Sequence, residues 1–176
     1  MIFQQYSSFP WKTVLENVAL PLIMSGVSKE EAFDKAATMI RTVGLGGHEN
    51  KWAKYPLLSG GQLQRVAIAR NLVASPDILL MDEPFGALDI ATRTNMQQTL
   101  LGLYYSVPNA TIIFVTHDIS EAVLLSDRIY IMKARPGDIY KVIDIDLPKG
   151  RGSEIRRDSS FADHVNFVDG IMSTLS

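Results

Sequence analysis

The sequence contains no cysteine, no long apolar run and no excess of either charge. Without cysteine it has neither a disulfide framework nor a thiolate metal site, which fits a cytoplasmic protein. The 17 lysines and arginines nearly balance 19 aspartates and glutamates, so the formal net charge of -2 gives no global basic field for nucleic acid. No run approaches the ~18 apolar residues of a spanning helix, and the N-terminus lacks the basic region of a signal peptide. We therefore expect a soluble chain that binds no nucleic acid and reaches a membrane only by docking to another protein.

A glycine-rich phosphate loop is also absent, because the pattern G-x-x-x-x-G-K-[ST] occurs nowhere in the 176 residues. Such a loop wraps a β-phosphate with backbone N–H groups and neutralises it with a lysine. The chain is nevertheless long enough, with 47% hydrophobic residues, to bury a sizeable core, and its length predicts one domain.

Apolar periodicity predicts that the first third of the chain is mostly helical. A helix is expected around 14–23, and another after Ser28, where Ser28 and Glu31 have the spacing of a capping box. Gly44 predicts the end of that second helix.

Two near-continuous apolar runs, 78–81 and 111–115, predict parallel strands buried on both faces. The helical pattern between them, about 90–105, is long enough for a crossover connection. The resulting βαβ unit ends both strands in polar residues, where open α/β sheets bind their ligands.

The remainder of the chain predicts a helix, two strands, a linker and a final amphipathic helix. Asp118 and Glu121 form a second capping pair. The other segments are strands at 128–134 and 139–147, a linker at 149–153 and a helix near 162–175. The basic residues of this region are interpreted as a solvated tail rather than a lipid site. They are Lys149, Arg151, Arg156 and Arg157.

The segment Ser59-Gly60-Gly61-Gln62 has the composition of a helix start that binds phosphate. Ser59 and Gln62 have capping-box spacing, and the two glycines leave backbone N–H groups open to close approach. The free donors and the dipole of a helix N-terminus attract phosphate oxygens. An ordinary capped helix is the alternative interpretation of this segment taken alone.

Asp82 and Glu83 end a predicted buried strand, an expensive place for adjacent carboxylates unless a cation or polar ligand offsets their desolvation. Asp82 can hold Mg²⁺ through water, and Glu83 can act as general base on an attacking water. A strand end that reaches solvent is the alternative. His117 ends the next strand and can reach a γ-phosphate or remain structural. Asp89 fits both an N-cap and a subunit contact.

In this order, the motifs resemble the nucleotide-binding subunit of ABC transporters over nearly the whole chain. Gln4 matches the Q-loop glutamine of that family, residues 58–62 the signature sequence, and Asp89 the D-loop. Asp82 and Glu83 match the Walker B aspartate and the catalytic glutamate, and His117 the switch histidine.

The resemblance implies a partial P-loop NTPase (RecA-like) α/β fold with an ABC-type helical subdomain. The expected parts are 1–74 (Q-loop and helical subdomain), 75–147 (RecA-like part) and 148–176 (linker and C-terminal helix). The implied cofactors are ATP and Mg²⁺, with Asp82 and Gln4 at the metal and Glu83, His117 and Gln4 as catalytic residues. Ser59, Gly60, Gly61, Gln62 and Asp89 would contact nucleotide.

The same resemblance implies partners and a location. Two ATP-binding subunits would form a homodimer or pseudo-dimer, and a transmembrane permease would dock near Tyr6, Phe9 and Trp11. The complex would lie at the cytoplasmic face of the plasma membrane and serve a solute-binding protein. Residues 134–137 and 154–157 are similar to importers of the nitrate, sulfonate and taurine type.

Members of this family carry their Walker A loop ahead of the Q-loop, so we expect that loop to precede Met1 in a longer reading frame. An open sheet lacking that strand would expose apolar surface and lower the solubility. Two other functions remain open at this point. The chain can be a non-hydrolysing interaction module that supplies its signature motif to a complete partner, or an ATPase with a soluble mechanical or regulatory role.

Overall fold

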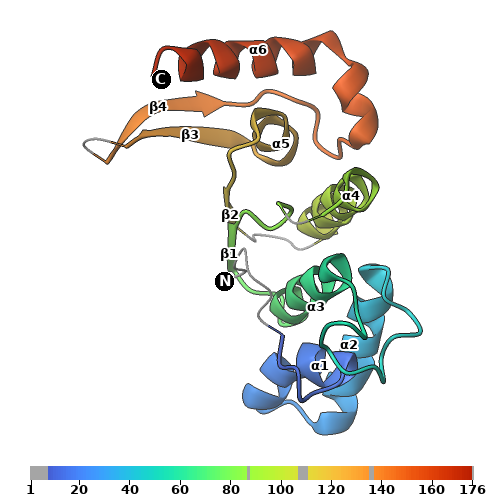
Figure 1. Ribbon diagram of the computed structural model, residues 1–176. Helices are drawn as coiled ribbons and strands as arrows, with labels where there is room; N and C mark the ends of the chain where they lie inside the picture. Colours follow the sequence, from blue (N-terminus) through green and yellow to red (C-terminus); the bar gives the residue numbers. More distant parts are fainter. Residues whose placement is uncertain (1–7, 87, 107–110, 135–136, 176) are drawn as a thin grey trace. The chain divides into compact units, whose positions relative to one another are not determined.

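The computed structural model describes residues 8–86, 88–106, 111–134 and 137–175. The fold divides into two compact units, Met1–Val115 and Thr116–Ser176. Figure 1 labels the helices and strands of both units. None of the helices in the described ranges is both long and apolar enough to cross a bilayer.

Three helices pack together in the first unit: α1 (Val14–Met24), α2 (Lys29–Thr42) and α3 (Gly60–Leu72). Gly44 adopts a φ of 68° just beyond α2, a conformation that suits glycine and ends the helix as predicted. The predominantly helical character of this region is confirmed. The helices share a core of fully or nearly fully buried aliphatic side chains, among them Val14, Val18, Leu22, Ala36, Ile40, Leu63 and Val66.

The predicted βαβ unit follows these helices. Strand β1 (Ile78–Asp82) pairs in parallel with β2 (Thr111–Val115), and α4 (Ile90–Ser106) connects them. The register aligns the first residues of the two strands and also their last residues, Asp82 and Val115. The carboxyl ends of both strands therefore lie at one edge of the sheet.

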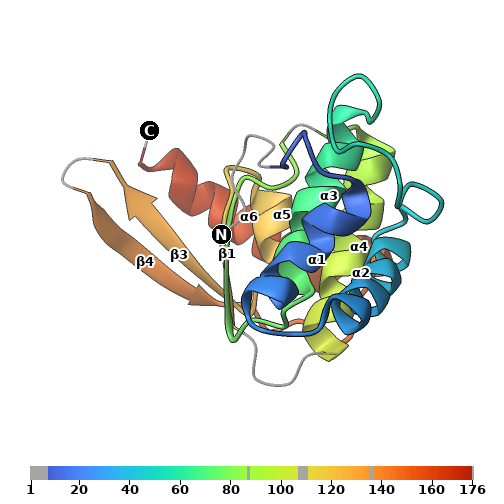
Figure 2. The ribbon, with the colours of Figure 1, turned by 90° about the horizontal axis from the view of Figure 1, so that it is seen from below.

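Burial of both sheet faces was the wrong prediction. Leu79 and Met81 are 3% and 2% exposed, whereas Ile78 and Ile113, on the opposite face, are 62% and 53% exposed. Helices α3 and α4 lie to one side of β1 (Figure 2). An apolar run indicates that both faces are apolar, but the helices of this unit cover only one of them.

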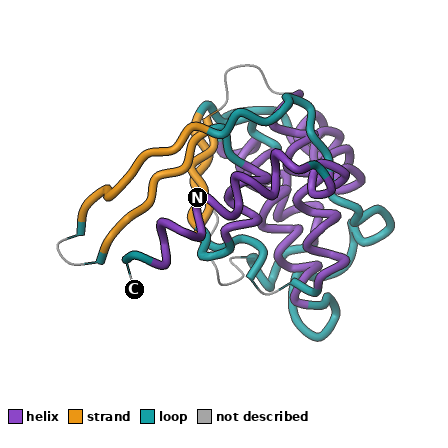
Figure 3. Tube along the Cα trace, turned by 90° about the horizontal axis from the view of Figure 1, so that it is seen from above, coloured by secondary structure: helices purple, strands orange, loops and turns teal. Residues whose placement is uncertain are grey.

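The second unit contains a long antiparallel hairpin and three helical segments. Strands β3 (Arg128–Lys133) and β4 (Asp138–Asp144) run side by side (Figure 3). The helical segments are α5 (Ile119–Leu125), the 3₁₀ helix η1 (Ser153–Arg157) and α6 (Ser159–Ser173). As predicted, Asp118 caps α5, because its carboxylate accepts a hydrogen bond of 3.0 Å from the N–H of Glu121.

Arg151 contradicts the prediction of a solvated basic tail. This residue is only 6% exposed. Its guanidinium donates hydrogen bonds to three backbone carbonyls, those of Leu124 at 2.9 Å, Ser126 at 2.7 Å and Leu147 at 3.2 Å. It also donates to the Asp127 carboxylate at 3.2 Å. Carbonyls at a helix end have no partner within the helix, so the end of α5 supplies acceptors that a buried cation satisfies.

Candidate functional site

The segment expected to contact a permease, called here the aromatic loop, includes Phe9 and Trp11. Its backbone is held by the side chain of Asn17, which is buried. Gln4 and Tyr6 lie outside the described residues. The Asn17 side chain accepts from the Phe9 N–H at 2.7 Å and donates to the Phe9 carbonyl at 3.0 Å. Trp11 is 67% exposed, and its ring centroid lies 5.6 Å from that of Phe9. Asn17 therefore holds the backbone of this loop while Trp11 faces outward.

Residues 59–62, called here the signature turn, form the capped start of α3. The Ser59 hydroxyl accepts from the Gln62 N–H at 3.3 Å, and the Gln62 side-chain oxygen accepts from the Ser59 N–H at 2.9 Å. This reciprocal pair is the capping box that the sequence predicted. The N–H groups of Gly60 and Gly61 belong to the first helical turn, whose donors find no partner within a helix.

Gly61 brings the signature turn against the segment that precedes α4. A Cβ atom at Gly61 would lie 3.1 Å from Cδ2 of Leu88, tighter than ordinary side-chain contact. The next residue, Asp89, caps α4 by accepting a 3.0 Å hydrogen bond from the Thr92 N–H. Hydrogen bonds from the Thr92 side chain and backbone lower the pKa of the Asp89 carboxyl, so it is ionised near neutral pH. Asp89 is exposed.

Asp82 and Glu83 form the acidic end of β1. The Glu83 N–H donates to the Val115 carbonyl at 2.9 Å, which continues the strand pairing by one residue. Glu83 then adopts a φ of 43°. This left-handed conformation costs a non-glycine residue about 1–2 kcal/mol, and such strain gathers at functional sites. Glycine would adopt this conformation without that cost, so stability does not explain why position 83 is a glutamate.

A buried glutamine on α3 holds the turn that follows Glu83. Gln64 is 1% exposed, and its side-chain amide donates to the Pro84 carbonyl at 2.5 Å. Phe85 is also 1% exposed and stacks at a tilt on Phe114 of β2, with 5.9 Å between ring centroids. Helix α3 is thus joined by a direct hydrogen bond to the turn that follows the acidic strand end.

Replacing Gln64 with leucine is expected to change the global stability by less than about 1 kcal/mol. The change leaves the Pro84 carbonyl without its donor, but it also removes the Gln64 side-chain oxygen, which is buried and finds no partner within the described part of the chain. The turn itself should loosen. Exchange of the Gly86 amide, which bonds to the Glu83 carbonyl at 3.2 Å, should therefore accelerate in hydrogen-exchange NMR.

Asn71→Leu is the matched control for that experiment. The Asn71 amide donates to the Ala67 carbonyl at 2.8 Å within the same helix α3. Equal Gly86 exchange in Gln64→Leu and the wild type would show that the Pro84 hydrogen bond does not restrain the turn.

His117 is exposed and belongs to the second unit, just before α5. Its neighbours fix the local backbone: the Thr116 hydroxyl donates to Glu121 at 2.6 Å and accepts from the Asp118 N–H at 3.0 Å. Within the first unit, the structure brings together the signature turn, the Asp89 cap and the acidic strand end.

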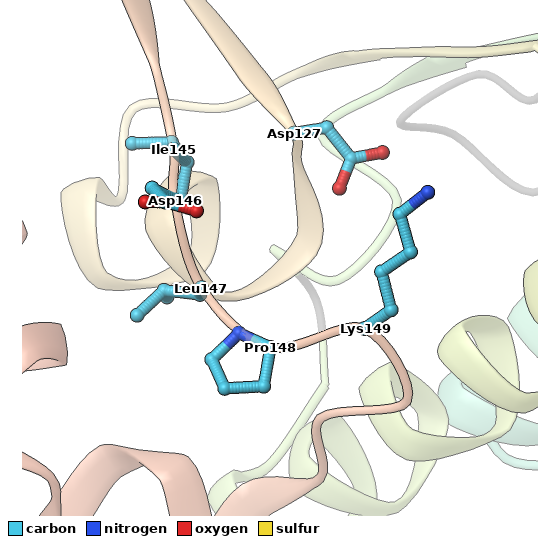
Figure 4. A pocket seen from close by; sticks show the side chains of 6 residues that line it. All are labelled: Asp127, Ile145, Asp146, Leu147, Pro148 and Lys149. Atoms are coloured by element: carbon cyan, nitrogen blue, oxygen red, sulfur yellow. The ribbon is translucent and has the colours of Figure 1, made fainter.

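A shallow pocket of about 580 Å³ opens in the second unit. Figure 4 shows that the Lys149 and Asp127 side chains point into the same opening. The other lining residues are Ile145, Asp146, Leu147 and Pro148. None of the residues predicted to contact nucleotide lines it, so this pocket does not mark the predicted site.

The carboxylates at the acidic end of β1 fit Mg²⁺ only as an ion that is shared with a bound phosphate. Among the described residues, no group of three or more histidine, aspartate or glutamate side chains could enclose a metal. Mg²⁺ in nucleotide enzymes is commonly bound by one or two carboxylates together with water and the substrate phosphates. Asp82 can supply one such carboxylate.

Comparisons with known proteins identify relatives of this chain. The family model for ABC transporters matches residues 1–86. The chain is 40% identical to the nitrate import ATP-binding protein NrtD of Synechocystis sp. over 98% of its length and 66% of that protein. It is 48% identical to the aliphatic sulfonates import ATP-binding protein SsuB of Bacillus cereus over 85% of its length and 57% of that protein. The chain thus spans less than two thirds of these relatives.

The solved dimeric structure of a post-hydrolysis ATP-binding cassette bound to ADP and Pi matches with a TM-score of 0.71 and 37% identity. That match covers 84% of this chain and 62% of the cassette. The fold is that of an ATP-binding cassette, within the P-loop NTPase class. In sequence and fold the chain is similar to the ATP-binding domains of ABC transporters, and relatives of it are named as nitrate and sulfonate import proteins.

Proposed function

We propose that this chain is part of the ATP-hydrolysing subunit of an ABC importer that takes up a small anion such as nitrate, a sulfonate or taurine. The proposal depends chiefly on one observation. A single unit holds the signature turn, the Asp89 cap and the acidic strand end together, through the Gln64–Pro84 hydrogen bond and the close approach of Gly61 to Leu88. The subunit would act peripherally at the cytoplasmic face of the membrane, with the aromatic loop toward a permease.

Each group in this unit has a distinct chemical role in the proposal. Asp82 helps to hold Mg²⁺, which supplies charge neutralisation for the transferring phosphoryl group, and Glu83 accepts a proton from the attacking water. The signature turn presents free N–H donors to the γ-phosphate of a nucleotide held by a second subunit. The cradle for the β-phosphate comes from outside these 176 residues. Phosphoryl transfer depends mainly on positioning and charge, so two chains can share one site.

ATP-dependent pairing tests this proposal. The purified chain is mixed with the complete Bacillus cereus sulfonate import ATP-binding protein, Mg²⁺ and a non-hydrolysable ATP analogue, and the mass of the complex is measured by light scattering. We expect a mixed dimer only in the presence of the analogue. Ser59→Asp should weaken pairing by at least about tenfold. The new carboxylate would repel the γ-phosphate, and a loss of about 1.4 kcal/mol in binding free energy corresponds to a tenfold weaker affinity.

The aspartate at position 59 still caps α3, so the variant tests charge rather than folding. Ser28→Asp is the matched control, because Ser28 caps α2 through its 3.3 Å contact with the Glu31 N–H. The control should pair as the wild type does. Pairing that ignores the nucleotide, or that is equally strong in Ser59→Asp, would refute the proposed role of the signature turn.

A further inference from the structure

His48 lies at the signature turn although the motif itself contains no histidine. It follows α2 in the chain, and its Nε2 lies 3.2 Å from the side-chain nitrogen of Gln62. Its Nδ1 lies 3.4 Å from the Gly46 carbonyl. The histidine therefore bridges the loop after α2 and the first turn of α3.

Only one assignment of protons satisfies all of these contacts. The Ser59 N–H is a donor, so the Gln62 atom that faces it at 2.9 Å must be the amide oxygen. The Gln62 amide nitrogen then points to His48 as a donor. His48 Nε2 must accept this hydrogen bond, which places the imidazole proton on Nδ1, where it can donate to the Gly46 carbonyl.

We propose that neutral His48 is a positioning residue for the signature turn, because its Nε2 fixes the Gln62 amide that completes the cap with Ser59. This inference rests on the proposed function, in which that turn contacts the γ-phosphate in a partner's site. His48 itself touches no nucleotide. It determines how firmly the N–H groups of the turn are held in place.

Protonation of His48 would remove this support. A cationic imidazole has donors at both nitrogens, so Nε2–H would face the donor group of Gln62. Rotating the Gln62 amide would satisfy His48 but would turn two donors toward each other at Ser59. One hydrogen bond of the cap is lost in either case, so ATP-dependent pairing should weaken when His48 gains a proton.

The charged groups near His48 come from three elements. Glu49 is the next residue in the loop, and its own backbone N–H and that of Gly47 lower the pKa of its carboxyl, with the charge of Arg41 acting in the same direction. Arg41 belongs to α2. Arg65 of α3 donates to the Gly44 carbonyl at 2.9 Å and is thereby held at the end of α2.

The first test uses the chain alone and needs no nucleotide. Long-range ¹H–¹⁵N correlation spectra at pH 8 should show His48 with its proton on Nδ1. The Ser59 amide should exchange about three- to tenfold faster in His48→Leu, the factor expected for the loss of one net hydrogen bond. His48→Gln should restore slow exchange, because its side-chain oxygen can accept from Gln62.

The matched control is His164→Leu in α6, where the histidine Nδ1 also contacts a backbone carbonyl, that of Ser160 at 2.7 Å. This change should leave Ser59 exchange unaltered. A proton found on Nε2 of His48, or unchanged Ser59 exchange in His48→Leu, would overturn the inference.

The second test measures ATP-dependent pairing with the sulfonate import relative between pH 5.5 and 8. Wild-type pairing should weaken toward low pH, whereas His48→Gln should lose most of that dependence and His48→Leu should pair weakly throughout. Pairing of equal strength in the wild type, His48→Gln and His48→Leu would refute the role of His48 while leaving the proposed function intact. Absence of pairing at every pH would refute the proposed function, and the NMR test would still decide the role of His48.

Discussion

Arg151→Ala is expected to destabilise the second unit by about 3–5 kcal/mol. The wild-type side chain is 1% exposed and donates to three backbone carbonyls as well as to Asp127. Removing the guanidinium takes a donor from each of those carbonyls, and a buried acceptor left unsatisfied costs about 1–3 kcal/mol. The ion pair with Asp127 contributes less, because that carboxylate is 53% exposed.

Hydrogen exchange measured by mass spectrometry can assign this loss to the correct unit. The α5 amides should lose protection in Arg151→Ala. Both tryptophans, Trp11 and Trp52, lie in the first unit, so their fluorescence provides an internal reference for it. Arg151→Lys should be intermediate, because one ammonium group cannot reproduce the fork of donors that reaches several carbonyls.

Arg157→Ala is the matched control from the same basic cluster. Arg157 is exposed, and its replacement should change stability by no more than about 0.5 kcal/mol. If α5 keeps full protection in Arg151→Ala, the hydrogen bonds of the guanidinium do not stabilise the end of that helix.

The contrast between Arg151 and Arg157 explains what sequence patterns could and could not predict. The spacing of apolar residues and of capping pairs is local, so it correctly predicted α2, the parallel pairing of β1 with β2, and the cap on α5. Local spacing does not distinguish a buried arginine from an exposed one within the same basic cluster. Arg151 is buried only because the end of α5, 25–27 residues earlier in the chain, supplies its acceptors.

The same limit applies at the candidate site. Motif order predicted the signature turn and the acidic strand end, yet the contacts that support them were missed. Gln64 bonds to Pro84, 20 residues away, and His48 contacts Gln62 across 14 residues. Gln64 follows the signature turn by two positions, but no local pattern indicates that a helix glutamine reaches a particular carbonyl. The φ of 43° at Glu83 likewise occurs between two tertiary contacts, that of the Glu83 N–H with the Val115 carbonyl and that of Gln64 with the Pro84 carbonyl.

Glu83→Gln should reduce ATP turnover by at least about 100-fold, because a positioned general base contributes roughly 10²–10⁴ to a rate. The experiment requires a form of the protein that carries the phosphate-cradling loop, with phosphate release measured at saturating ATP and Mg²⁺. Glutamine has nearly the same shape, so ATP binding and the strained backbone at this position should persist. The loss should therefore appear in kcat and leave nucleotide affinity nearly unchanged.

Asp77→Asn is the control, because Asp77 and Glu83 flank opposite ends of the same strand, β1. Asp77 is exposed just before β1, and its carbonyl accepts from the Thr111 N–H at 2.8 Å, a backbone contact that the substitution preserves. Its turnover should match the wild type. If Glu83→Gln also hydrolyses ATP within a few-fold of the wild type, the general base lies elsewhere. If the wild type pairs with ATP but never hydrolyses it even with the cradle present, the chain is instead the interaction module that the sequence left open.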